Sequence, residues 1–212
     1  MTGLICGILL SWAALCASSP SFLARRQASI GGCDQVSIMI AQENCYGPLM
    51  NVSQMQPPSG DNVFNDIEAS CRDVAEANIC FEDEMKICGK SGRTLATMMA
   101  NTFEYVCGEG LEIMLSESDC WAHENFTSDI LECSAIMEAE FARLGYNGFC
   151  SVTNNFIWCI GERIQSKTVC SEEAAWFVQE LFRRSIRPAA DLMSCRLHTR
   201  AIRAIVDVLR RK

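Results

Sequence analysis

Apolar side chains recur every three or four residues along most of this chain, which is the spacing of the buried face of a helix. The segments with this pattern cover residues 36–45, 67–88, 95–106, 128–144 and 152–164. Strict alternation of apolar and polar residues, typical of a half-buried strand, does not occur over a comparable length. The pattern therefore predicts an all-α fold.

Glycine and proline mark the predicted ends of these helices, because proline lacks a backbone N–H and glycine weakens a helix. Residues 46–61 carry Gly-Pro, Pro-Pro and Ser-Gly pairs, so we expect a loop or linker there. Residues 89–92, Gly-Lys-Ser-Gly, are expected to stop the helix before them. Pro188 is expected to end the helix that Ser171 caps, and residues 189–209 form a predicted last helix.

Residues 103–121 combine a helix end, a hinge and a second helix. The first helical run ends in Cys107, a Gly-Glu-Gly hinge follows, and a short amphipathic turn ends in Cys120 beside Trp121. This order predicts a helix–helix corner whose cysteines are bonded to neighbouring helices.

The amino-terminal segment predicts secretion. Residues 4–15 are apolar apart from one glycine and one serine, which is too short for a membrane span but suits a signal peptide. We therefore assign residues 1–18 as a signal peptide and expect a secreted, extracellular protein that does not span a membrane. Residues 19–60 are interpreted as an extension and linker, and residues 61–212 as a cysteine-rich helical domain with a basic carboxy-terminal helix.

Cysteine usage predicts a disulfide framework. Of the 14 cysteines, all but Cys6 and Cys16 follow the predicted signal peptide, and an even number in a secreted chain indicates disulfides. These twelve are Cys33, Cys45, Cys71, Cys80, Cys88, Cys107, Cys120, Cys133, Cys150, Cys159, Cys170 and Cys195. No Cys-x-x-Cys pair and no pair of histidines at metal-ligand spacing is present, so no metal or other cofactor is predicted.

The spacing of two cysteines constrains how the helices are joined. Nine residues separate Cys71 from Cys80, which places them on opposite faces of one helix and about 13 Å apart. A disulfide cannot bridge that distance, so each is expected to bind a different neighbour. The predicted fold is an irregular bundle of about six to eight helices braced by six disulfides.

Charge is unevenly distributed. The chain carries a net charge of −8, yet residues 183–212 contain nine basic and only two acidic side chains. The residues before position 183 form an acidic body, which repels the phosphates of nucleic acid, so we predict no binding to nucleic acid. The predicted last helix is typical of one that docks on anionic lipid, sulfated glycan or an acidic partner, although it can also fold back onto the acidic body. The arginines expected to bind such a partner are Arg196, Arg200, Arg203 and Arg211.

Two further motifs bear on modification and catalysis. The sequons at Asn51 and Asn125 predict N-glycosylation. His123, oriented by Asp119, can serve as a general base, which leaves a secreted hydrolase as an alternative function. Neither a Gly-x-Ser-x-Gly elbow nor a His-Glu-x-x-His motif is present, so we predict no enzyme activity and no catalytic residue.

The order of cysteines in residues 61–195 resembles that of secreted cysteine-rich helical domains of invertebrates. The resemblance is carried by Tyr105-Val106-Cys107-Gly108-Glu109-Gly110, by Ser118-Asp119-Cys120-Trp121, and by Cys133, Cys150, Cys159, Cys170 and Cys195. The chain resembles most a nematode family classed as a domain of unknown function. Its resemblance to insect haemolymph glycoproteins is weaker. The resemblance implies a secreted, disulfide-bonded, all-helical domain and carries over no catalytic residue.

The sequence thus predicts a secreted, non-catalytic binding module whose partner is an extracellular protein, a glycan or an apolar small molecule. A carrier of a small apolar ligand is the first alternative, because methionines can line a pocket between helices. Packing of the same methionines in a filled core is the competing interpretation. They are Met50, Met55, Met85, Met98, Met99, Met114, Met137 and Met193.

Overall fold

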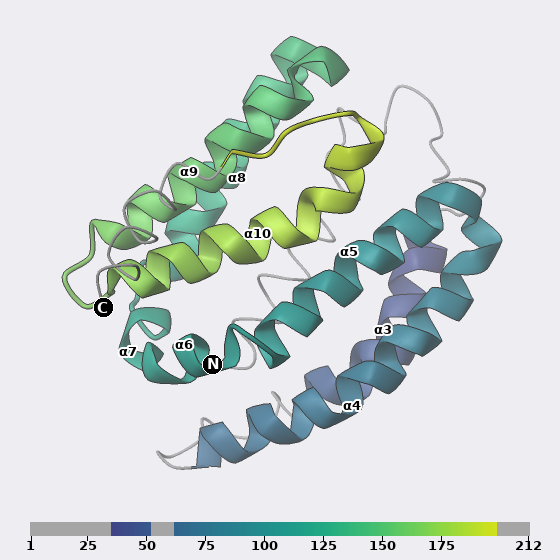
Figure 1. Ribbon diagram of the computed structural model, residues 1–212, viewed down its shortest axis with the longest axis horizontal. Helices are drawn as coiled ribbons and strands as arrows, with labels where there is room; N and C mark the ends of the chain where they lie inside the picture. Colours follow the sequence, from purple (N-terminus) through teal and green to yellow (C-terminus); the bar gives the residue numbers. More distant parts are fainter. Residues whose placement is uncertain (1–34, 52–61, 199–212) are drawn as a thin grey trace. The chain divides into compact units, whose positions relative to one another are not determined.

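The computed structural model describes residues 35–51 and 62–198 of the chain (Figure 1). These residues form eight α-helices and two 3-10 helices and contain no strand, which confirms the predicted all-α, disulfide-rich fold. The chain divides into two compact units, Met1–Leu111 and Glu112–Lys212. The predicted boundaries at residues 18 and 60 lie outside the described residues.

The first unit contains three long helices. They are α3 (Gln35–Asn51), α4 (Asn62–Met85) and α5 (Gly89–Cys107), with the 3-10 turn η2 (Lys86–Cys88) between the last two. Both α3 and α5 pack against α4 (Figure 1). One disulfide, Cys45–Cys80, joins α3 to α4, and another, Cys71–Cys107, joins α4 to α5. The prediction that Cys71 and Cys80 bind different neighbours is therefore confirmed.

Aromatic packing fills the core of the first unit. The ring of Tyr46 stacks on Phe103, with ring centroids 4.9 Å apart, and it tilts against Phe81 at 5.4 Å. Tyr46, Phe81 and Met85 are fully buried, and each buried side chain of this size contributes about 1.5–3 kcal/mol. The hydroxyl of Tyr46 donates a 2.8 Å hydrogen bond to Asn78 Oδ1, so the polar end of the ring has a partner.

The loop predicted for residues 46–61 is wrong at its beginning, because α3 continues through Gly47 and Pro48 to Asn51. Proline at position 48 removes the bond to the carbonyl of Asn44, but Asn44 is exposed and water can replace that bond. Cys45 and Tyr46 are fixed by the disulfide and by core packing. These tertiary contacts outweigh the local preference against a helix.

Residues 89–92 are expected to stop the helix before them, and η2 does end at Cys88, but a new helix, α5, begins at Gly89. The positive φ of Gly89, 63°, allows the chain to change direction directly after η2. Gly92 lies one turn into α5, where a Cβ atom would meet the Met85 carbonyl oxygen at 2.3 Å. The two glycines therefore allow a close approach of α4 and α5 rather than forming a linker.

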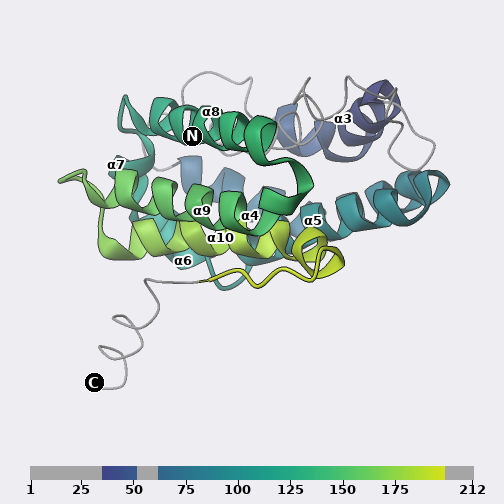
Figure 2. The same ribbon diagram turned by 90° about the horizontal axis from the view of Figure 1, so that it is seen from above.

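The second unit contains the remaining helices. They are most of α6 (Leu111–Ser116), then α7 (Ser118–Trp121), α8 (Phe126–Leu144), the 3-10 turn η3 (Gly145–Gly148), α9 (Phe149–Gln165) and α10 (Glu172–Leu192). Both α8 and α10 pack against α9 (Figures 1 and 2). The three disulfides of this unit are Cys120–Cys170, Cys133–Cys159 and Cys150–Cys195.

The end of α10 differs from the sequence prediction. Ser171 caps the helix as expected, since its hydroxyl accepts a 3.0 Å hydrogen bond from the Ala174 amide. Pro188 does not end it, because Ile186 and Ala190 on either side are buried and the helix runs on to Leu192. Residues 189–192 of the predicted last helix are helical but continue α10, and residues 193–198 are not helical, so a separate helix from residue 189 is wrong over 193–198. Residues 199–209 of that predicted helix lie outside the described residues.

All eleven cysteines of the described residues are disulfide-bonded. Ten form the five bonds given above, and Cys88 is disulfide-bonded as well. Cys33 lies outside the described residues. Of the two cysteines predicted to bond neighbouring helices, Cys107 is bonded to Cys71 on α4, whereas Cys120 is bonded to Cys170 in the connection between α9 and α10.

Candidate functional site

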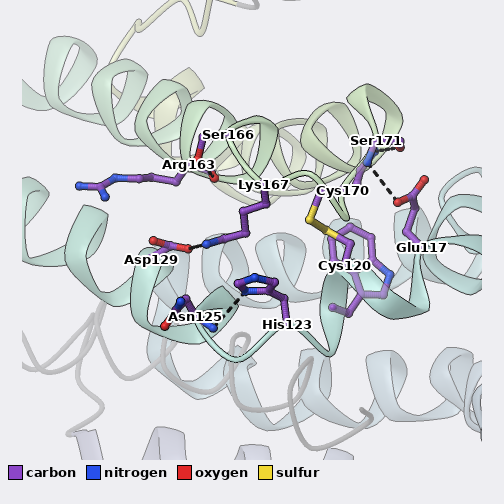
Figure 3. Close-up of a disulfide and its surroundings, with 12 residues drawn as sticks. Glu117, Cys120, His123, Asn125, Asp129, Arg163, Ser166, Lys167, Cys170 and Ser171 are labelled. Atoms are coloured by element: carbon purple, nitrogen blue, oxygen red, sulfur yellow. Dashed lines mark hydrogen bonds and ion pairs between the residues drawn. A yellow bond between two sulfur atoms is a disulfide. The ribbon is translucent and has the colours of Figure 1, made fainter.

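The corner, taken here as α6, α7 and the start of α8, contains Asp119, His123 and Asn125, three of the polar residues for which the sequence predicts a role. The disulfide Cys120–Cys170 ties it to the connection between α9 and α10 (Figure 3). Beside the disulfide, the Ser171 backbone N–H donates to Glu117 Oε2 at 3.3 Å. The corner is thus bonded to the start of α10 by one covalent and one polar contact.

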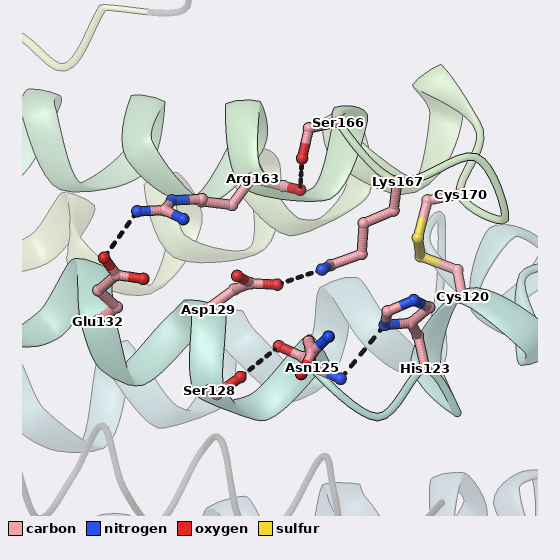
Figure 4. Close-up of polar contacts among 10 residues, drawn as sticks. All are labelled: Cys120, His123, Asn125, Ser128, Asp129, Glu132, Arg163, Ser166, Lys167 and Cys170. Carbon is pink, nitrogen blue, oxygen red and sulfur yellow. Dashed lines mark hydrogen bonds and ion pairs between the residues drawn. A yellow bond between two sulfur atoms is a disulfide. The ribbon is translucent and has the colours of Figure 1, made fainter.

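His123 lies in the turn between α7 and α8. Its Nδ1 accepts a 3.2 Å hydrogen bond from the Asn125 backbone N–H (Figure 4). Asp119, expected to orient this ring, is exposed, and the orienting bond comes from Asn125 instead. The bond joins the ring to the backbone two residues further along the chain. The geometry makes His123 a support of the turn.

Two ion pairs join the first half of α8 to the end of α9 and the residues that follow. Lys167 Nζ lies 2.6 Å from Asp129 Oδ2, and the two side chains are only 12% and 13% exposed. Arg163 donates to Glu132 at 2.8 Å, but this pair is largely exposed and contributes at most about 1 kcal/mol. Asp129 also lies in the first turn of α8, where the helix dipole favours a carboxylate. The nearly buried pair of Lys167 and Asp129 is therefore the stronger of the two contacts.

Asn125 lies immediately before α8, and its side chain is exposed (Figure 4). The other sequon residue, Asn51, is the last residue of α3, and its side chain lies outside the described part of the structure. Of the four arginines predicted to bind a partner, only Arg196 is described, and it is exposed. Arg200, Arg203 and Arg211 lie outside the described residues.

The chain around Arg196 is held by a contact that sequence analysis missed. The side-chain amide of Asn154 on α9 donates to the Arg196 carbonyl at 3.2 Å and accepts from the His198 backbone N–H at 2.7 Å. One turn earlier on α9, Cys150 is bonded to Cys195. Residues 195–198 are therefore fixed along α9 rather than helical.

The outward face of α3 is the second feature that the sequence analysis did not identify. Val36, Met39 and Ile40 are 61%, 57% and 53% exposed, and their spacing places them side by side on one face of the helix. Ile38 and Ala41 on the other face are buried. The signal was present in residues 36–45, since a helix that is apolar on all sides normally has neighbours on all sides.

The methionines divide between core and surface. Met85, Met99 and Met114 are buried within their units, whereas Met193 is exposed. Met50 and Met55 belong to parts of the chain whose side chains are not described. Met85 and Met99 belong to the apolar core cluster of the first unit.

The described residues contain neither a metal-binding cluster nor a membrane-spanning helix. No cluster of three or more histidine, cysteine, aspartate or glutamate side chains is placed there to hold a metal ion. None of the described helices combines the length and the apolar character needed to cross a bilayer.

No family model matches this sequence, and no curated protein or solved structure matches it either. The resemblance to invertebrate cysteine-rich domains therefore stays a prediction.

Proposed function

We propose that this protein is a secreted, non-catalytic module that binds an extracellular protein through the outward face of α3. The observation that carries the proposal is the exposure of Val36, Met39 and Ile40 on one face of a disulfide-bonded helix. Disulfides in this number are typical of proteins that function in an oxidising compartment. The signal peptide expected in residues 1–18 and the two sequons support the same compartment.

The three exposed apolar side chains of α3 can contribute substantially to the free energy of binding when a partner covers them. Three apolar side chains that are each more than half exposed would contribute on the order of 3 kcal/mol when a partner covers them. Because α3 is bonded to α4 through Cys45–Cys80, the helix is ordered before the partner arrives. Preorganisation of this kind lowers the entropy lost on association.

The charge of α3 favours an apolar protein surface over the other predicted partners. Glu43 is the only charged residue of α3, and the helix contains no lysine or arginine. A sulfated glycan or an anionic lipid would find no cation on this face. The basic carboxy-terminal residues stay a second candidate for such ligands, and deletion of residues 199–212 with heparin retention as the measurement tests it.

The two alternative functions receive less support. A carrier of an apolar ligand needs methionines that line a pocket, and Met85 and Met99 instead belong to the apolar core cluster of the first unit. A hydrolase needs a basic nitrogen, and Nδ1 of His123 is already engaged by the Asn125 amide. Extraction of the secreted protein with organic solvent tests for a bound apolar ligand.

Site-specific photo-crosslinking tests the proposed binding face. A benzophenone amino acid replaces Met39 in one sample and Thr97, an exposed residue of α5, in the control. Both proteins are irradiated in extracellular fluid from the tissue that expresses the chain. We expect one discrete adduct at position 39, none at position 97, and loss of the adduct in a Val36→Ser/Ile40→Ser background with unchanged circular dichroism. Equal labelling at both positions, or an adduct that survives the double substitution, would overturn the proposal.

A further inference from the structure

The sequon Asn125-Phe126-Thr127 is divided between solvent and core. Asn125 and Thr127, the two residues that define an acceptor, are exposed. Phe126 between them is buried and packs edge-on against Trp121, with ring centroids 5.3 Å apart. The buried ring fixes the backbone while the acceptor residues on either side remain accessible.

Both backbone polar groups of Asn125 make hydrogen bonds, whereas its side chain makes no capping bond. The backbone N–H donates to His123 Nδ1, and the carbonyl accepts from Ser128 Oγ at 2.9 Å and from the Asp129 amide at 3.0 Å. Asparagine at this position normally caps the helix with its side-chain oxygen. Here the Asn125 side chain makes no capping bond to α8.

Because the side chain of Asn125 does not cap α8, a modification of that side chain breaks no capping bond. A substituent on Nδ2 of Asn125 would replace no hydrogen bond to the described residues and would extend from an exposed position. The turn below it is held by Phe126 and by the Cys120–Cys170 disulfide, so the attachment point is rigid.

We propose that Asn125 carries an N-linked oligosaccharide, an inference that rests on the proposed secretion of the chain. The donor is a lipid-pyrophosphate-linked oligosaccharide. The bond between its anomeric carbon and the pyrophosphate oxygen breaks, a bond from that carbon to Nδ2 of Asn125 forms, and the amide releases one proton. The lipid pyrophosphate leaves, and no oxidant or reductant is required.

The glycan covers the amino end of α8. This helix has 19 residues and is about 28 Å long, so a glycan at Asn125 shields the turn around His123 and leaves the other end of α8 open. The exposed polar side chains of this turn, Glu124 and Ser128, then lie under carbohydrate. We expect cleavage of this turn by added protease to be at least several-fold slower in the glycosylated protein.

The test measures occupancy on the full chain expressed in eukaryotic cells. Purified protein is treated with peptide N-glycosidase in ¹⁸O water, and the peptide containing position 125 is examined by mass spectrometry. We expect isotope incorporation at Asn125. The glycan mass should be lost in Asn125→Gln and Thr127→Ala, retained in Thr127→Ser, and unchanged at this peptide in Asn51→Gln. The matched Thr127 pair separates loss of the sequon from loss of folding.

Two outcomes separate this inference from the proposed function. Secreted wild-type protein with an unmodified Asn125 peptide would overturn the glycan while leaving the secreted module intact. Failure of the wild-type chain to enter the secretory pathway would overturn the proposed function. In that case a chain whose residues 1–18 are replaced by a proven signal peptide still reports on Asn125, and an unmodified peptide there would contradict the inference.

Discussion

Trp121 donates its indole N–H to the backbone carbonyl of Met114 at 2.8 Å, and this buried hydrogen bond holds α7 against α6. The same ring packs against Phe126 and Phe177, with centroid distances of 5.3 and 5.5 Å. The corner therefore depends on one side chain that fills space and satisfies a carbonyl.

Replacing Trp121 with phenylalanine should destabilise the second unit. Trp121→Phe removes the donor and leaves the Met114 carbonyl buried without a partner, which costs about 1–3 kcal/mol. Denaturant unfolding followed by far-ultraviolet circular dichroism measures the loss. Trp158→Phe is the matched control, because Trp158 is exposed and its substitution should change stability by less than about 0.5 kcal/mol. Equal losses in the two variants would contradict the role given to the indole N–H.

Glu180 should make the free energy of unfolding of the second unit decrease at acidic pH. Its carboxylate is 4% exposed and accepts hydrogen bonds from Arg183 at 2.6 Å and Arg184 at 2.7 Å. Burial raises the pKa of this carboxyl, but the bonds and charges of the two arginines outweigh burial and hold the pKa below its ordinary value of 4.5. The ionised form is therefore favoured in the folded state. Its contribution is complete above about pH 4.5 and is lost as the pH falls through the lower folded-state pKa.

The corresponding variant is Glu180→Gln. It should lower the free energy of unfolding by about 1–3 kcal/mol at neutral pH, and the difference from wild type should shrink below pH 4.5. Asp191→Asn on the same helix is the control, because its pair with Arg187 is exposed and 3.8 Å long. That control should change stability by at most about 1 kcal/mol. A difference between wild type and Glu180→Gln that grows in acid would have the wrong sign for this explanation.

Asn154 should control hydrogen exchange at the end of the described chain. In Asn154→Ala the His198 amide loses its acceptor, and its exchange rate should rise about two- to tenfold. Asn154→Asp keeps an acceptor for His198 but loses the donor to the Arg196 carbonyl, so exchange at His198 should stay near wild type. Amide exchange followed by nuclear magnetic resonance measures both. Asn155→Ala, which removes only an exposed bond to Glu140, serves as the control.

Helical periodicity was enough to predict most of the fold. The patterns at residues 128–144 and 152–164 correspond to α8 and α9 within a few residues, because both helices bury one continuous face. The opposite orientation of Cys71 and Cys80 followed from helix geometry alone and is observed. The pairing of the cysteines did not follow from it, because that depends on which helices are neighbours.

The errors arose where tertiary contacts override a local rule. Pro48 and Pro188 each lie inside a helix, because buried residues close to them, Tyr46 and Ala190, are packed in the core. The contacts of Asn154 with residues 196 and 198 had no sequence signal, since hydrogen bonds across more than 40 residues leave no local pattern. The apolar residues of 36–45 indicated neighbours on all sides of α3, but they did not show which side the described residues leave uncovered.

Gln42 offers a route to a more stable first unit. Its Nε2 is buried in α3 and has no hydrogen-bond partner within the described part of the chain. Gln42→Met removes that unsatisfied donor while keeping the side-chain length, so the free energy of unfolding should rise by about 1 kcal/mol. Denaturant unfolding measures the gain. Gln165→Met, at an exposed position of α9, should change stability by less than about 0.5 kcal/mol. A loss of stability in Gln42→Met would mean that the amide has a partner in solution.

The disulfides provide a test of whether the two compact units unfold independently. Cys71–Cys107 closes a loop within the first unit and Cys133–Cys159 a loop within the second, with sequence separations of 36 and 26. Removing either bond with paired alanine substitutions should cost its own unit about 2–4 kcal/mol.

Hydrogen exchange followed by mass spectrometry can assign each loss to one unit. Cys71→Ala/Cys107→Ala should accelerate exchange in α4 and α5 but leave α9 unchanged. Cys133→Ala/Cys159→Ala should do the reverse. Each disulfide joins helices of a single compact unit, so its removal loosens the packing of that unit directly. If either pair of substitutions accelerates exchange equally in α5 and α9, the units unfold as one cooperative domain, and the division at Leu111 has no thermodynamic meaning.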